Sequence, residues 1–234
     1  MDEPEGPEPE MRAVPWGGRD LALAFAVALL VAVGAIVVFL TVTDPASDLV
    51  VFGIGGALIY LSISLSFWHF VVRRTGATWE QVGFRDIQPS LILRLAGWTL
   101  VTLFMSGAVS ILVESLTGRS PSSAAPVFPD TPTSEELLVT TVLACLIAPI
   151  VEEFIFRGLL LGYLRTRVKV GLAVALTAAL FAVVHLIPIQ LAPLFVFGLM
   201  FGFVRVRYDN VWAAVLMHAM VNGIAVWVSF ALTT

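Results

Sequence analysis

Long apolar stretches are the feature that most constrains the fold of this chain. Of its 234 residues, 59% are hydrophobic and only 13% are charged, whereas a soluble domain carries about a quarter charged residues. The mean hydropathy is +0.95. A run of about 20 apolar residues is long enough for a helix that spans a bilayer. The composition therefore predicts an all-α, polytopic membrane helix bundle.

About seven stretches are long enough, or nearly so, to span the membrane. Pro188 and Pro193 predict a tight break between the fifth and sixth stretches. We expect the sixth, which is short, to be tilted or partly buried. Thr133 and Glu136 form a capping-box pattern that predicts the start of the fourth helix. The expected spans are about 21–42, 49–72, 91–113, 134–164, 171–187, 189–204 and 211–232.

The basic residues that flank these stretches predict the orientation, because cytoplasmic loops accumulate Lys and Arg. They fall on one side of the seven-span arrangement, and the other side has Arg119. We therefore expect a cytoplasmic N-terminus, an external C-terminus and a multi-pass location in a prokaryotic plasma membrane. The residues on the basic side are Arg12, Arg19, Arg73, Arg74, Arg85, Arg165, Arg167, Lys169, Arg205 and Arg207.

Two partner and cofactor classes are disfavoured by the composition. The basic residues are few and scattered, so nothing indicates nucleic acid binding. Cys145 is the only cysteine; this excludes an intramolecular disulfide and a metal site built on several cysteines. The partner that the composition does indicate is the lipid bilayer.

Five ionisable residues lie inside the most apolar half of the chain: Glu152, Glu153, Arg157, His185 and His218. A charged side chain at the centre of a membrane helix is disfavoured by about 2.5–3.5 kcal/mol, so such groups usually face a cavity and have partners. One alternative is purely structural, with Glu153 and Arg157 paired four residues apart on one helix face. That alternative leaves Glu152 without a partner.

The expected depths of the polar residues bring them to a common level. At about 1.5 Å per residue, Glu152, His185, His218 and Asn222 lie roughly 18, 21, 10 and 16 Å from the cytoplasmic ends of their helices. These values fall near the middle of a bilayer core about 30 Å thick. Phe181 is four residues from His185, and His218 is four from Asn222, so each pair shares a helix face. The pattern predicts one polar cavity built from three spans.

Pro149 stands close before the two glutamates. A proline inside a helix has no amide hydrogen, so we expect the carbonyl of Cys145, four residues back, to lose its usual hydrogen bond. The resulting kink would open the helix and admit water beside the carboxylates.

Three short motifs resemble the signature motifs of the CPBP intramembrane proteases, a family that includes CAAX prenyl endopeptidases and bacteriocin-processing or self-immunity proteins. They are Glu152-Glu153-Phe154-Ile155-Phe156-Arg157-Gly158, Phe181-Ala182-Val183-Val184-His185 and His218-Ala219-Met220-Val221-Asn222. They occur in order on separate helices, within about 134–232. The HExxH, GxSG and GxGD motifs of other intramembrane proteases do not occur.

The resemblance implies hydrolysis of a peptide bond by a water that a carboxylate activates. It assigns Glu152 as the general base, His185 as the group that helps to orient and activate the water, and His218 and Asn222 as oxyanion donors. Glu153 would support the site by pairing with Arg157. The predicted catalytic residues are Glu152, Glu153, His185, His218 and Asn222, with Arg157 and Phe181 as supporting residues.

Several alternatives stay open at this point. Two imidazoles and a carboxylate suffice for a catalytic zinc, with His185, His218 and Glu152 as ligands, although the metal-free version is favoured. A proton-coupled transporter would also keep ionisable groups near the midplane, and a non-catalytic membrane scaffold could retain the same fold. The substrate implied by the resemblance is a peptide or protein, and whether it is prenylated or membrane-bound is open.

We divide the chain into three parts. Residues 1–20 form an acidic, proline-rich tail that we expect to be disordered and cytoplasmic. Residues 21–133 hold the first three helices and a loop at 78–89 that we expect along the membrane interface. Residues 134–234 hold the remaining four helices and, by resemblance, the CPBP-like catalytic membrane domain.

Overall fold

The computed structural model describes residues 13–42, 49–121 and 133–233, and the regular structure in these ranges is helical. The α-helices are α1 (Gly18–Val42), α2 (Leu49–Phe67), α3 (Trp79–Val82), α4 (Pro89–Thr117), α5 (Ser134–Thr141), α6 (Ala148–Glu153), α7 (Leu161–Leu164), α8 (Val170–Val184), α9 (Leu191–Tyr208) and α10 (Val211–Thr233). The π-helical segments are η1 (Trp68–Arg73), η3 (Val142–Ile147) and η4 (Phe154–Leu160), and η5 (Pro188–Gln190) is a 3-10 turn.

Within the described ranges, six helical stretches rather than seven are long and apolar enough to cross a membrane. The predicted fifth span, 171–187, is the 15-residue helix α8, which is about 22 Å long at 1.5 Å per residue and so shorter than a bilayer core of about 30 Å. The predicted sixth span is longer than expected, because η5 and α9 run together over Pro188–Tyr208. The multi-pass membrane character is confirmed, and the count of seven is corrected.

The end of α8 follows from the residues after it. Pro188 has no amide hydrogen to continue the helix, and the residue before a proline is driven to extended backbone. Ile187 has φ −115° and ψ 91°, as expected. Leu186 then takes the left-handed conformation, with φ 57°, which is uncommon for a residue other than glycine. The turn leaves His185 at the C-terminal cap of α8, not inside a span.

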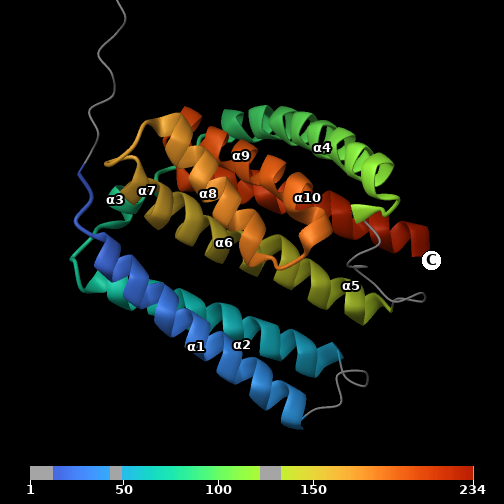
Figure 1. The fold of residues 1–234 in the computed structure, drawn as a ribbon, viewed down its shortest axis with the longest axis horizontal. Coiled ribbons are helices and arrows are strands. Elements are labelled where there is room, and N and C mark those ends of the chain that lie inside the picture. Colours follow the sequence, from blue (N-terminus) through green and yellow to red (C-terminus); the bar gives the residue numbers. More distant parts are fainter. Residues whose placement is uncertain (1–12, 43–48, 122–132, 234) are drawn as a thin grey trace, which may run out of the picture.

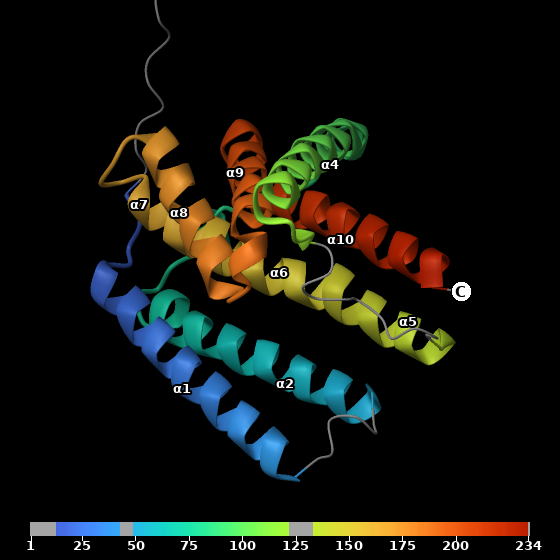
Figure 2. The same cartoon turned by 45° about the vertical axis from the view of Figure 1, so that its right-hand side comes forward.

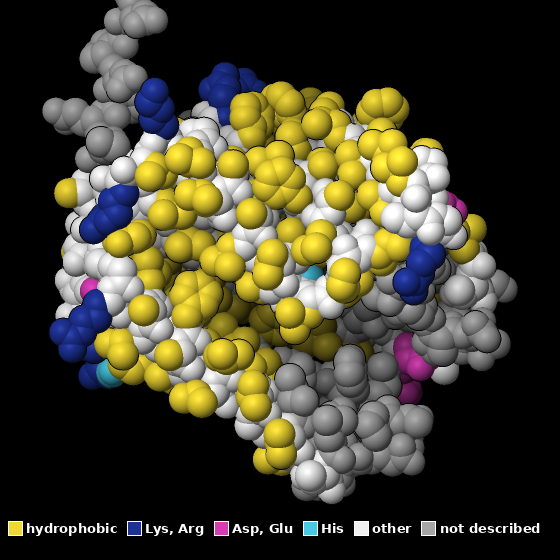
Figure 3. Space-filling view, in the orientation of Figure 1, with side chains coloured by type: hydrophobic (Ala, Val, Ile, Leu, Met, Phe, Trp, Pro, Cys, Tyr) yellow, Lys and Arg dark blue, Asp and Glu magenta, His cyan; other side chains and the backbone are white. Residues whose placement is uncertain are grey.

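The helices form two groups on either side of one central span (Figures 1 and 2). The central span, Ser134–Leu164, consists of α5, η3, α6, η4 and α7 in one continuous run. Helices α1 and α2 pack together on one side of it, and α4, α8, α9 and α10 pack on the other. Apolar side chains cover the exterior (Figure 3), as a lipid environment requires.

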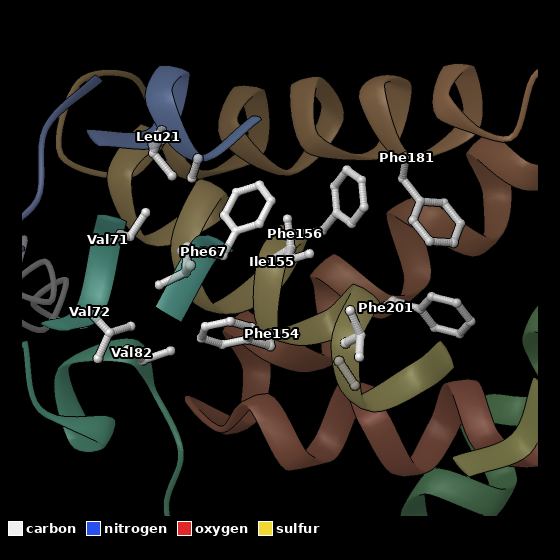
Figure 4. Close-up of a cluster of buried hydrophobic side chains, with 14 of the residues drawn as sticks. Leu21, Phe67, Val71, Val72, Val82, Phe154, Ile155, Phe156, Phe181 and Phe201 are labelled. Atoms are coloured by element: carbon white, nitrogen blue, oxygen red, sulfur yellow. The ribbon is translucent and has the colours of Figure 1, made fainter. Parts of the chain in front are cut away.

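The core lies where the central span meets both groups. Phe67 and Val71 from α2 and η1, Phe154 from η4, Phe181 from α8 and Phe201 from α9 belong to one buried cluster (Figure 4). Helices α8 and α9 pack especially closely. The ideal Cβ of a side chain at Gly198 would lie 2.8 Å from the Cα of Ala178, and one at Gly202 would lie 2.8 Å from Val174 Cγ1. The absence of a side chain at these two positions therefore lets the backbones of α8 and α9 approach closely.

Basic side chains meet at one end of the bundle. Asp209, between α9 and α10, pairs with Arg205 at 2.9 Å, Arg85 at 3.1 Å and Arg165 at 3.8 Å. These three arginines belong to α9, the α3–α4 loop and the end of α7, so the three segments share this end. The C-terminal end of α10 lies at the other end (Figure 1). Which compartment faces each end stays a prediction.

Two predicted segments are more closely integrated than expected. The interfacial loop at 78–89 contains α3, and its Gly83 carbonyl accepts a hydrogen bond from the Val211 amide at 2.8 Å. The predicted tail, 1–20, overlaps the bundle at its end, because α1 begins at Gly18 and Trp16 is buried. Trp16 Nε1 donates to the Leu159 carbonyl at 3.1 Å. Residues 1–12 lie outside the described residues, and the division into three domains stays a prediction.

Candidate functional site

The central span is interrupted by π-helical turns on both sides of the glutamate pair. In η3 the amide of Ala148 donates to the carbonyl of Leu143, five residues back. The next donor in that register would be the nitrogen of Pro149, which has no hydrogen. The carbonyl left without a partner is therefore that of Ala144, and Nδ2 of Asn222 donates to it at 2.7 Å. Pro149 thus leaves the carbonyl of Ala144 free, not that of Cys145 as predicted, because the helix is π-helical there. The predicted kink that would admit water stays a prediction.

A cavity of about 370 Å³ lies between the central span, α2, α8, α9 and α10. Glu152, His185, His218 and Asn222 line it together, although they come from α6, the cap of α8 and α10. His185 and His218 line the same cavity, although the depths expected for them from the sequence differ. The ring of Phe181 lies 4.7 Å from that of His185 and 5.9 Å from that of His218.

Glu152 has one oxygen bound and the other without a partner. The hydroxyl of Tyr60, on α2, donates to Oε1 at 2.9 Å. Oε2 is buried and has no hydrogen-bond partner among the residues that the structure describes. Tyr60 was not singled out from the sequence. Its hydroxyl gives little local signal, because the same stretch, Gly55–Arg73, also contains Ser62, Ser64 and Ser66.

Glu153 is fully buried and contacts the guanidinium of Arg157 and the imidazole ring of His218. Its Oε1 accepts from Nη1 of Arg157 at 2.9 Å, which confirms the predicted pair, and contacts Nδ1 of His218 at 2.9 Å. Arg157 is also fully buried, and its Nη2 donates to the carbonyl of Gly198 at 2.9 Å. Its guanidinium lies 4.6 Å from the centre of the Phe181 ring. The pair therefore links the central span to α9 and α10.

The contacts of the two histidines determine which ring nitrogen is available to the cavity. Nδ1 of His185 lies 2.6 Å from the carbonyl oxygen of Phe181; a carbonyl only accepts, so Nδ1 carries the hydrogen. Nε2 of a neutral His185 then has a free lone pair. Nδ1 of His218 is engaged by Glu153, which also leaves Nε2 available. Phe201 stacks on the His218 ring with centroids 4.5 Å apart and further fixes its orientation.

A second cavity, of about 460 Å³, lies on the other side of Glu152 between α1, α2, η4 and α8. Most of its lining is apolar, with Phe25, Phe67 and Ile155 among the residues. Tyr60, Glu152 and His185 line both cavities. Glu152 therefore borders two cavities, one that is also lined by His218 and Asn222 and a second whose lining is mostly apolar.

The zinc alternative requires that two histidines and a carboxylate converge on one point. Within residues 13–42, 49–121 and 133–233, no group of three or more His, Cys, Asp or Glu side chains is arranged to hold a metal ion. Glu152, His185 and His218 line one cavity without forming such a group. In this geometry the three side chains do not fit a zinc ion.

Fold and site together define a multi-pass membrane protein with a polar cavity enclosed by its apolar helices. Residues 134–224 match the family described as type II CAAX prenyl endopeptidase Rce1-like. This part of the chain is therefore an Rce1-like CAAX endopeptidase domain, and membership of that family implies an intramembrane protease. Searches of curated proteins and of solved structures gave no match. The match begins at α5, so Tyr60 and the α1–α2 hairpin lie outside it.

Proposed function

We propose that this protein is an intramembrane endopeptidase that hydrolyses a peptide bond with a water activated by Glu152. The observation that carries the proposal is the state of that carboxylate. Oε1 is held by Tyr60, while Oε2 has no partner among the described residues and lies beside a cavity lined by His185, His218 and Asn222. A buried carboxylate oxygen with no protein partner is suited to bind a water and take a proton from it.

In the proposed mechanism the water oxygen attacks the carbonyl carbon while its proton passes to Glu152. His185 assists, because its Nε2 lone pair accepts a hydrogen bond from the same water. The tetrahedral intermediate then collapses, the carbon–nitrogen bond breaks, and Glu152 returns the proton to the leaving amine. One carboxylate thus serves as base and then as acid.

His218 and Asn222 are the proposed oxyanion donors. Asn222 uses one amide hydrogen on the Ala144 carbonyl, and a side-chain amide has a second hydrogen to donate. His218 donates from Nε2 when its ring carries both protons, because the hydrogen on Nδ1 is directed at Glu153. Fixed donors aimed at the developing oxyanion stabilise the transition state without reorganising during the reaction.

The finer features of substrate and location belong to the same proposal. The CAAX endopeptidase family implies a peptide substrate, and the apolar cavity beside Glu152 suits one that is lipid-modified or membrane-bound. The cluster of arginines around Asp209 supports a cytoplasmic location for that end of the bundle. We place the protein in a prokaryotic plasma membrane with its N-terminus in the cytoplasm.

Comparison of peptide termini in membranes that contain wild-type or Glu152→Gln protein tests the proposed function. We expect at least one new terminus that depends on Glu152, together with cleavage of a farnesylated CAAX peptide by the purified wild-type protein. His185→Ala and His218→Ala should abolish cleavage while the proteins still insert in the membrane. Identical terminus profiles for wild type and Glu152→Gln would contradict the proposal. Activity that disappears on chelation and returns with zinc would favour the metal-dependent alternative instead.

A further inference from the structure

Tyr60 lies on the α1–α2 hairpin, outside the matched domain. Its side chain makes a polar contact with the candidate site. Its hydroxyl donates to Glu152 Oε1 at 2.9 Å, and it lines both cavities that meet at this carboxylate. We propose that Tyr60 is a positioning residue that binds one oxygen of Glu152 and so presents the other to the water. This inference rests on the proposed function, because it assigns Tyr60 a role through Glu152.

A carboxylate needs such a partner if one particular oxygen is to act as the base. Glu152 is only partly buried, and its terminal torsion is broad and has no single strongly preferred angle. A single donor on Oε1 fixes that torsion and leaves Oε2 without a partner among the described residues. Ser64, also on α2, does not substitute for Tyr60, because its hydroxyl already donates to the Tyr60 carbonyl at 2.7 Å. Among the described residues, the Tyr60 phenol is the one side-chain donor to Glu152.

The approach of α2 to the central span is built into its sequence. Gly53, Gly56 and Tyr60 are spaced three and four residues apart, so they share one face of α2. An ideal Cβ at Gly53 would lie 2.6 Å from Val139 Cγ1, and one at Gly56 would lie 3.7 Å from Leu143 Cδ1. The glycine face thus allows α2 to lie close against α5 and η3, and this close approach brings Tyr60 within reach of Glu152.

The two helices of the hairpin are held together by specific contacts. Ser66 Oγ donates to the carbonyl of Ala24 at 3.0 Å, and the rings of Phe25 and Phe67 make an edge-to-face contact at 4.8 Å. These contacts join α1 to α2 within the membrane-facing part of the molecule. The hairpin is therefore a second support for the active carboxylate, independent of the Glu153–Arg157 pair that supports His218.

The test compares Tyr60→Phe, which deletes only the hydroxyl, with Tyr163→Phe as a matched control. Tyr163 packs on Arg167 and lines neither of the two cavities beside Glu152. With the farnesylated CAAX peptide as probe, we expect Tyr60→Phe to lower kcat by about 10-fold to 100-fold, the loss typical of a hydrogen bond to a charged group. KM and the melting temperature should stay at the wild-type values, and Tyr163→Phe should change neither kcat nor KM.

An infrared measurement tests the same contact without any substrate. The difference spectrum between wild type and Tyr60→Phe should contain a shifted carboxylate stretching band, and that band should be absent when both proteins also carry Glu152→Gln. Wild-type kcat and no carboxylate band in Tyr60→Phe would overturn the inference. If Glu152→Gln is inactive in that case, the proposed function stands alone; if Glu152→Gln is as active as wild type, both fall.

Discussion

Oε1 of Glu153 lies 2.9 Å from Nδ1 of His218, and the same oxygen accepts from Nη1 of Arg157 at 2.9 Å. One fully buried carboxylate oxygen therefore balances a buried arginine and orients a histidine on another helix. In both glutamates Oε2 has no hydrogen-bond partner among the described residues, but only Glu152 lines the cavity, whereas Glu153 contacts Arg157 and His218 through Oε1. This difference supports a structural role for Glu153 and the proposed chemical role for Glu152.

Glu153→Gln should destabilise the protein and reduce its activity. Removal of one partner from a buried ion pair leaves the other charge uncompensated and costs about 3–5 kcal/mol. The double variant Glu153→Gln/Arg157→Met removes both charges, so it should recover much of the melting temperature measured in detergent. Its kcat should stay low, because His218 still lacks its carboxylate. Recovery of both stability and kcat in the double variant would show that Glu153 only neutralises Arg157.

Pro149→Ala should lower kcat without lowering stability. The substitution gives position 149 an amide hydrogen, which competes with Asn222 for the Ala144 carbonyl. The proposed oxyanion donor is then held less firmly. Complete removal of an oxyanion donor lowers kcat by about 100-fold or more, so we expect Pro149→Ala to lower kcat by up to about 100-fold. Pro193→Ala, in the first turn of α9, is the control, because amides there have no intrahelical acceptor. Equal kcat values for the two variants would contradict the proposed part of Asn222.

Gly198→Ala should destabilise the contact between α8 and α9. The added methyl group would meet the backbone of Ala178, with a Cα 2.8 Å away, and backbone atoms cannot rotate aside. Overpacking of this kind costs about 1–3 kcal/mol. Gly97→Ala in α4 is the control, because nothing lies within 4 Å of its ideal Cβ, and it should gain about 0.5–1 kcal/mol. A melting temperature that rises in both variants would refute the close packing.

Asp209 should make stability depend on pH in the acid range. Partial burial by itself would raise the pKa of Asp209, but the hydrogen bond and charge of Arg205, with Arg85 and Arg165, hold that pKa below its usual value. The folded state therefore prefers the ionised form more than the unfolded state does. Its contribution to stability is complete above the unfolded-state pKa and is lost as the pH falls through the folded-state pKa.

Asp209→Asn isolates this contribution. Asparagine tolerates the left-handed backbone of this position, where φ is 43°, so the substitution removes the charge with little added strain. The melting temperature of wild type should fall more steeply than that of Asp209→Asn between neutral and acid pH. The difference should shrink in high salt, because Asp209 is half-exposed and its ion pairs are screened. Parallel curves would contradict the inferred ion-pair cluster.

Local sequence patterns predicted the helices better than their exact ends. Thr133 and Glu136 form the capping box as expected, with hydrogen bonds of 3.2 and 2.6 Å, because this motif depends only on residues three apart. The fifth predicted stretch, 171–187, does form a helix, but the left-handed turn at Leu186, which the hydropathy pattern does not indicate, ends α8 at Val184 and leaves it shorter than a bilayer span. The π-helical turns beside Pro149 were also beyond local prediction, since they depend on the carbonyl partner that α10 supplies.

The sequence by itself determined that the chain is a helical membrane protein and that Glu152, His185, His218 and Asn222 are the exceptional polar residues in its spans. Hydropathy and helical spacing are local properties, so they can be read without neighbours. Only the tertiary structure decided that the Glu152 oxygens differ, that Glu153 contacts His218, and that Tyr60 reaches the site. These contacts join residues 92 and 65 positions apart, and such pairs depend on how the helices pack, which no local pattern specifies.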